Sequence, residues 1–169
     1  MVHLSLAVVV GFTVTFVYAA TGTSSPLAFI LSLLHGMTVT CFVVSMMRRD
    51  ARSDQVGGKY TSSVLYPGLP HSAIYGITTL IVAVLMLCPL AHVLGNSELA
   101  YMLVLITVLI AGINTVLGAR IDQLSTRASF TPFPGFESEA NSLMAQQAGV
   151  SVVHAVAICV ILLMFGRIV

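Results

Sequence analysis

The chain has 169 residues, of which 57% are hydrophobic and 8% carry a formal charge. Soluble globular domains have about 25% charged residues, so this composition excludes that class and indicates an integral membrane protein. The formal net charge is only +1, and the chain therefore lacks the basic surface that binding to a nucleic acid requires.

The first apolar run covers about residues 4–20, which is close to the shortest length that crosses a bilayer. A secretory signal peptide would have a similar length, and the segment from Val17 to Ala19 offers small residues near a cleavage point. However, the residues before this run include no Lys or Arg, which a signal peptide normally carries there. We therefore interpret the run as a first transmembrane helix that is retained.

The second run, about residues 27–47, has no charged residue and is bounded by Pro26 and by Arg48 and Arg49. Proline is favoured in the first turn of a helix, and the two arginines place charge in the headgroup layer. Only a short polar turn separates this helix from the first, so the two are expected to form an antiparallel hairpin. His35 lies within the span, where a titratable group is costly and often functional.

Two more spans are predicted after an exposed polar loop, at about residues 72–93 and 98–118. We expect Pro89 to kink the last turns of the earlier span, because proline removes a backbone donor. The turn between the two spans begins at Gly95. We expect Arg120 to end the later span.

The last part of the chain predicts an extended segment followed by a fifth span. Residues 130–136 contain three phenylalanines and two prolines, a combination that disfavours a helix. The next helix is expected to begin outside the bilayer near Ser138, a favourable N-cap residue, and to form the fifth span at about residues 148–165. Four aromatic residues outside the spans would dock against a partner protein or enter the headgroup layer. They are Phe130, Phe133, Phe136 and, before the third span, Tyr66.

Together these runs predict an all-α integral membrane protein, a single bundle of five transmembrane helices over residues 1–169. Six of the seven Lys and Arg residues lie in the connections after the second and fourth spans. Because basic residues favour the cytosolic type of compartment, we expect the amino terminus on the cytosol or matrix side and the carboxyl terminus on the opposite side.

His35 and His154 are the two histidines well inside these spans, and two histidines from different helices can ligate a haem. Counted from the expected span ends, they differ in depth by roughly 9 Å, so we interpret them as hydrogen-bonded packing residues. The cysteines, Cys41, Cys88 and Cys159, lie in separate runs and form no disulfide or metal-binding pattern. No set of catalytic residues can be assembled, and we predict no catalytic or metal site.

Small residues recur at helical spacing within the spans, which is typical of faces where two helices approach closely. Examples are Ser72 with Gly76 and Thr115 with Ala119. Asn114 is placed to form a hydrogen bond across helices. These positions predict packing faces rather than chemistry.

Several short motifs resemble the transmembrane protein 205 family, whose members are small four-span membrane proteins without an assigned reaction. The motifs are His35-Gly36, the region from Thr40 to Phe42, Leu65-Tyr66-Pro67 before the third span, Asn114 through Arg120, and His154 in the last span. The resemblance covers about residues 30–165 and implies a four-span architecture, to which this chain adds its first run. It implies no reaction and no ligand.

The packing faces and the uncovered aromatic segment favour a non-catalytic accessory subunit of a larger membrane complex, in contact with lipids and other subunits. We expect a respiratory complex of the inner mitochondrial membrane. One alternative is a small membrane oxidoreductase that binds haem or quinone at His35 and His154. The second is a small transporter or channel with a water-accessible path past Asn114 and Thr115.

Overall fold

The computed structural model describes residues 26–130 and 134–165. Within these ranges the regular elements are all helices, so the all-α class is confirmed. The helix expected at residues 4–20 lies outside the described residues. The elements are α2 (Pro26–Arg49), α3 (Ala51–Val56), α4 (Ser62–Leu65), α5 (His71–Leu85), α6 (Leu87–Leu94), α7 (Ser97–Phe130) and α8 (Phe136–Phe165).

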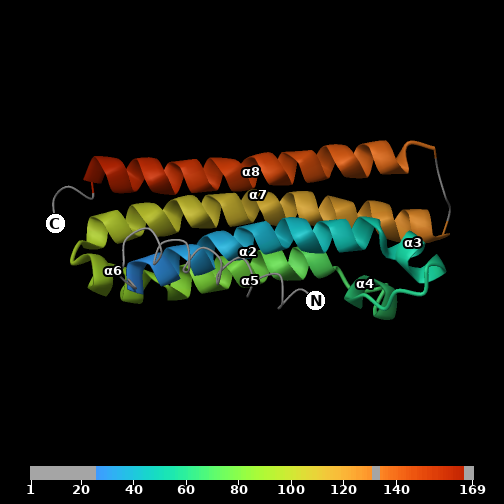
Figure 1. Ribbon diagram of the computed structural model, residues 1–169, viewed down its shortest axis with the longest axis horizontal. Helices are drawn as coiled ribbons and strands as arrows, with labels where there is room; N and C mark the ends of the chain where they lie inside the picture. The colour runs from blue at the N-terminus through green and yellow to red at the C-terminus, as the bar shows by residue number, and fades with distance from the viewer. Residues whose placement is uncertain (1–25, 131–133, 166–169) are drawn as a thin grey trace.

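Four helices, α2, α5, α7 and α8, run along the length of the molecule (Figure 1). α2 packs against the other three, and α7 packs against α5 and α8. The short helices α3 and α4 lie at one end of the bundle and α6 lies at the other. We name the end with α3 and α4 the basic end, because Arg48, Arg49, Arg52 and Lys59 lie there.

Three of the described helices, α2, α7 and α8, are long and apolar enough to cross a membrane. A fourth span results if α5 and α6, which meet at 41°, act as one broken helix. The architecture therefore agrees with a membrane-spanning bundle, but the described residues supply three or four spans rather than five.

The break between α5 and α6 is the kink that Pro89 predicted. The ring of a proline collides with the carbonyl group four residues earlier, and α5 ends at that residue, Leu85. After α6, Gly95 adopts a left-handed conformation with φ of 62°, which a glycine accepts without strain. The side chain of Asn96 then accepts a hydrogen bond of 3.0 Å from the backbone N–H of Leu99, so the predicted turn is confirmed.

One predicted helix boundary is wrong. α7 does not end at Gly118 or Arg120 but continues to Phe130, whereas α8 begins at Phe136, close to the start that we expected near Ser138. A charged residue ends an apolar run without ending a helix, because its side chain extends into water while the backbone hydrogen bonds continue. After Gly118, α7 contains no glycine or proline that would end the helix. The helix therefore continues beyond the end of the apolar run.

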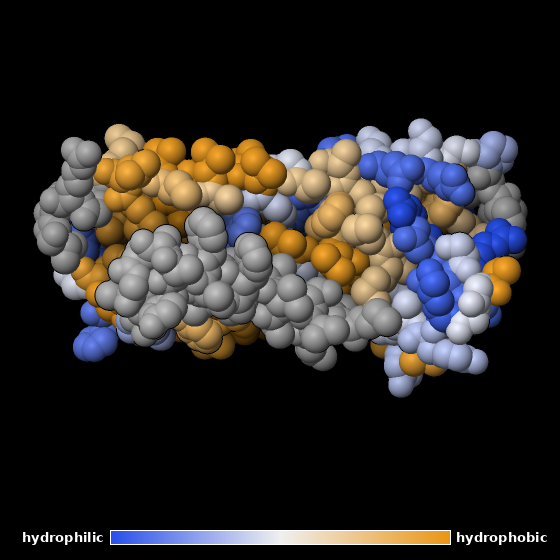
Figure 2. Space-filling view, viewed as in Figure 1, coloured by the Kyte–Doolittle hydropathy of each residue, from blue (hydrophilic) through white to orange (hydrophobic). Residues whose placement is uncertain are grey.

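The buried apolar side chains form two clusters that lie at opposite ends of the bundle. The larger cluster, which we call the apolar seal, lies at the α6 end and draws on every long helix: Ile30, Leu34, Ala83, Leu90, Leu94, Leu99, Ala100, Leu103, Val104 and Ile158. The smaller one, at the basic end, consists of Leu117, Ile121, Leu143 and Met144. Figure 2 shows the hydrophilic residues of the visible face gathered mostly toward the basic end.

Helices α5 and α7 approach each other most closely at two glycines. A Cβ atom added to Gly76 would lie 2.8 Å from the Cα atom of Thr115, and one added to Gly118 would lie 2.8 Å from the Cβ atom of Ser72. Neither distance is sterically acceptable. The packing role predicted for Ser72, Gly76 and Thr115 is therefore confirmed, and Gly118 joins them.

We expect Gly76→Ala to destabilise the protein by about 1–3 kcal/mol, because the added methyl group overlaps the backbone of α7. The measurement is thermal unfolding of the detergent-solubilised protein. Gly112→Ala is the matched control, because a Cβ at that position meets no atom within 4 Å. Equal unfolding temperatures for the two variants would contradict this packing.

Candidate functional site

Buried polar side chains recur every seven residues on the helices that line the bundle interior. Two helical turns separate such residues, so each pair lies on one face of its helix. The pairs are Thr38 and Ser45 on α2, Thr107 and Asn114 on α7, and Gln147 and His154 on α8, and all six side chains are buried. We call these six residues, together with His35 and Ser151, the polar seam.

The centre of the polar seam is a direct contact between two histidines. Nδ1 of His35 lies 3.4 Å from Nδ1 of His154, and the ring centroids are 5.6 Å apart. Thr38 Oγ1 lies 3.4 Å from the same nitrogen of His154, and Thr107 Oγ1 lies 3.0 Å from its Nε2 atom. His154 is fully buried, and both of its ring nitrogens have partners.

The hydroxyl groups fix the direction of these hydrogen bonds. Thr107 donates its only hydroxyl proton to the carbonyl oxygen of Leu103 at 2.8 Å, so it accepts the Nε2–H proton of His154. A neutral imidazole has one N–H, and Nδ1 of His154 is therefore an acceptor. Thr38 donates to the carbonyl oxygen of His35, which leaves Nδ1–H of His35 as the donor to His154. The result is an ordered chain from His35 through His154 to Thr107.

This contact overturns the expected difference in depth between His35 and His154. The expected depth depended on a membrane boundary at Ala148, and each residue by which that boundary lies earlier on α8 moves His154 about 1.5 Å deeper. Ligation of a haem iron by the pair would require the two rings to separate, since a metal must lie between the ligating nitrogens. Within the described ranges, no group of three or more His, Cys, Asp or Glu residues could hold a metal ion.

The layer of the seam next to the histidines contains polar atoms without partners. Gln147 donates from Nε2 to the carbonyl oxygen of Asn114 at 3.2 Å, and Ser151 donates to the carbonyl oxygen of Gln147 at 3.1 Å. Both side-chain polar atoms of Asn114, Oε1 of Gln147 and Oγ of Ser45 are buried and form no hydrogen bond within the described part of the chain. The hydrogen bond that we expected from the Asn114 side chain is therefore not formed there.

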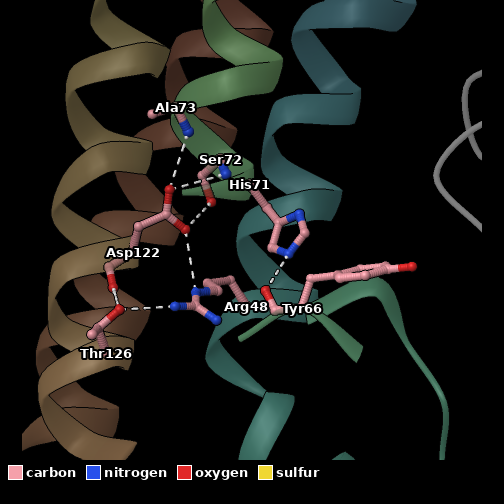
Figure 3. A network of polar contacts seen from close by, with 7 residues as sticks. All are labelled: Arg48, Tyr66, His71, Ser72, Ala73, Asp122 and Thr126. Atoms are coloured by element: carbon pink, nitrogen blue, oxygen red, sulfur yellow. Dashed lines mark hydrogen bonds and ion pairs between the residues drawn. The ribbon is translucent and has the colours of Figure 1, made fainter. Parts of the chain in front are cut away.

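A buried ion pair, Arg48 with Asp122, lies toward the basic end, and Figure 3 shows its contacts. Arg48 Nε lies 3.4 Å from Asp122 Oδ1, and both side chains are almost completely buried. The Arg48 guanidinium also donates to Thr126 Oγ1 at 2.8 Å, and that hydroxyl donates to the carbonyl oxygen of Asp122. Arg48 thus crosses from α2 to α7.

Asp122 also caps the start of α5. Its Oδ2 atom accepts the backbone N–H groups of Ser72 at 3.0 Å and Ala73 at 3.1 Å, while the Ser72 hydroxyl donates to Oδ1 at 3.2 Å. The first turn of a helix leaves such N–H groups without intrahelical partners, and its positive dipole end favours a carboxylate. Sequence reasoning missed this role because it ended the helix at Gly118. Asn114, Gly118 and Asp122 follow each other at intervals of four residues, which places them on one face of a continuing helix. This spacing was the signal in the sequence that could have revealed the role of Asp122.

Three of the four aromatic residues that we expected to dock against a partner are described by the structure, and they lie near the basic end. Tyr66 is 59% exposed at the end of α4, and its carbonyl oxygen lies 3.0 Å from Nε2 of His71. Phe136 is the first residue of α8 and is half-buried, while Phe130 is the last residue of α7. Phe133 lies outside the described residues, and the docking role stays a prediction.

We expect Asp122→Ala to destabilise the protein by about 3–5 kcal/mol, because it leaves the buried Arg48 without its counter-ion and uncaps α5. Arg48→Met should cost less, since Asp122 keeps its hydrogen bonds to Ser72 and Ala73. Denaturant unfolding in detergent would measure both variants. A greater loss for Arg48→Met than for Asp122→Ala would contradict the capping role.

Comparison with known proteins adds no relative: no family model, no curated protein and no solved structure matches the chain. The resemblance to the transmembrane protein 205 family accordingly stays a prediction. The functional interpretation rests on the geometry of the polar seam and of the Arg48–Asp122 pair.

Proposed function

We propose that the protein is an integral membrane protein that carries protons along the polar seam, between the basic end and the His35–His154 pair. The observation that supports this proposal is the group of buried, unpartnered polar atoms of Ser45, Asn114 and Gln147. In hydrocarbon, each such atom costs several kcal/mol, so positions of this kind are retained where water or a polar solute is accommodated.

The order of the polar groups along the bundle gives the path its direction. On α7, Thr107, Asn114 and Asp122 follow each other at intervals of about 11 Å, given a rise of about 1.5 Å per residue. The charged pair therefore lies at the basic end, the neutral amides lie between, and the histidines lie deepest. Beyond the histidines the interior consists of the apolar seal. A path of this form begins at the basic side, and a proton leaves it on the other side when the apolar seal opens.

The chemistry of the central pair favours a proton over a larger solute. A neutral imidazole ring donates a hydrogen bond through one nitrogen and accepts one through the other. The ordered hydrogen bonds of His35, His154 and Thr107 give a proton successive acceptors at 3.4 and 3.0 Å. The amides of Asn114 and Gln147 carry no charge that would repel a hydronium ion.

An accessory role in a respiratory complex, which the composition favoured, stays a prediction. The exposed apolar residues of α7 and α8, such as Leu105, Leu109 and Val156, suit lipid and protein neighbours equally. The polar seam is a more specific feature, and we therefore place the transport role first. This role corresponds to the path past Asn114 that the sequence offered as an alternative.

Accessibility of introduced thiols tests the path. In a cysteine-free background, we expect Ser45→Cys and Asn114→Cys to react with a small, charged, membrane-impermeant thiol reagent added on the basic side only. Val116→Cys, two residues from Asn114 on the outer face of α7, and Leu103→Cys in the apolar seal are the controls and should not react. Modification of Val116→Cys to the same extent as Asn114→Cys would contradict an interior path.

Proton movement itself can be measured in liposomes that contain the purified protein and an internal pH-sensitive dye. With a potassium diffusion potential as the driving force, we expect the wild-type protein to acidify the interior faster than empty liposomes do. His154→Gln should abolish the difference, because an amide cannot exchange a proton and still occupies the hydrogen-bonding position. His92→Gln, an exposed histidine on α6, is the control. Equal rates for His154→Gln and the wild type would contradict the proposal.

A further inference from the structure

The basic end contains a second feature, a surface cavity of about 1220 Å³ that borders the proposed proton path at Arg48. Its wall is built from the end of α2, from α3 and α4, from the last turns of α7 and from the first two turns of α8. Its polar side chains include Arg49, Arg52, Ser63 and Ser138.

The wall contains more arginines than carboxylates, and one of the arginines forms no ion pair with a described residue. Arg49 donates to both carboxylate oxygens of Asp50, at 2.6 and 2.9 Å, and to Asn141 Oδ1 at 2.6 Å. Asp50 is therefore neutralised within the wall. Glu137 faces the same cavity and opposes part of the positive charge. Arg52 is exposed on α3 and forms no ion pair with any described residue, so its guanidinium is available to a ligand.

The second observation is a buried hydroxyl group that belongs to a residue of the cavity wall. Ser63 is 1% exposed and lines the wall, and its Oγ atom has no hydrogen-bonding partner among the described residues. A buried hydroxyl without a partner is costly, and it gains a partner when an oxygen-rich ligand occupies the cavity. Ser138 lies in the first turn of the long helix α8, where backbone N–H groups lack intrahelical acceptors.

We propose that this cavity binds a phosphate group. Guanidinium groups, hydroxyls and the N–H groups of a helix start are the donors that recognise phosphate oxygens. The cavity lies where the apolar surface of the bundle gives way to hydrophilic residues, which is the depth of the lipid headgroups. The phosphate therefore belongs either to an anionic phospholipid or to a water-soluble phosphate ester. The net charge of the wall is small, which suits a phosphodiester better than a polyanion.

The experiment uses the full-length protein in nanodiscs and native mass spectrometry. One set of nanodiscs contains phosphatidylcholine alone, and the other contains phosphatidylcholine with phosphatidylglycerol. In a third arm, glycerol 3-phosphate is added to the phosphatidylcholine nanodiscs. We expect one phosphatidylglycerol molecule to remain bound per chain, and Arg52→Gln and Ser63→Ala each to lower its affinity by about fivefold. Both substitutions spare the hydrogen bonds that hold the fold.

Arg120→Gln is the control, because it removes the same charge from an exposed position on α7 outside the cavity. Loss of phosphatidylglycerol with Arg52→Gln but not with Arg120→Gln supports a lipid headgroup site. Binding of glycerol 3-phosphate with the same dependence on Arg52 supports the site with a soluble phosphate as its ligand. Equal effects of Arg52→Gln and Arg120→Gln, or retention of neither ligand by the wild type, would overturn the proposal.

Discussion

The described bundle depends on the carboxylate of Asp122, because this one group joins three helices. It belongs to α7, accepts the backbone N–H groups of Ser72 and Ala73 at the start of α5, and lies against Arg48 of α2. Removing an ionised side chain from water costs several kcal/mol, which only a full set of partners offsets. Here the partners are N–H groups that the helix end would otherwise leave unsatisfied. The same contacts therefore stabilise both the charge and the start of α5.

This arrangement also fixes the register of α5 against α7. Gly118 lies one helical turn before Asp122 and faces Ser72, and Thr115 lies almost one further turn back and faces Gly76. A shift of α5 by one turn would separate the carboxylate from the helix start and would move the glycines away from the side chains that they accommodate. Because electrostatic and steric requirements select the same register, the path-lining residues of α7 are held in a fixed orientation toward α2 and α8.

The sequence predicted features that depend on local chemistry, and it did not predict contacts between distant segments. Apolar runs located α2 and α7, and the sterics of Pro89 and the conformational freedom of Gly95 located the break and the turn. The end of α7 was wrong because charge ended the apolar run inside a continuing helix. The membrane boundary expected at Ala148 placed His154 at a different depth from His35, so their contact was not predicted. Such a contact depends on the relative positions of α2 and α8, which no local pattern contains.

The gradient from charged to neutral to apolar groups limits how the proposed path can open. The free-energy cost of a permanent charge is lowest at the basic end, where Asp122 and Arg48 neutralise each other. Imidazole suits the interior because it can be neutral when no proton is carried. The remaining barrier is the apolar seal, which packing holds closed. Its residues Leu90 and Leu94 belong to α6, which meets α5 at 41°, and its other residues belong to α2, α5, α7 and α8. The contacts of Asp122 lie toward the opposite end of the bundle, so the group that fixes the register of α5 is separate from the seal.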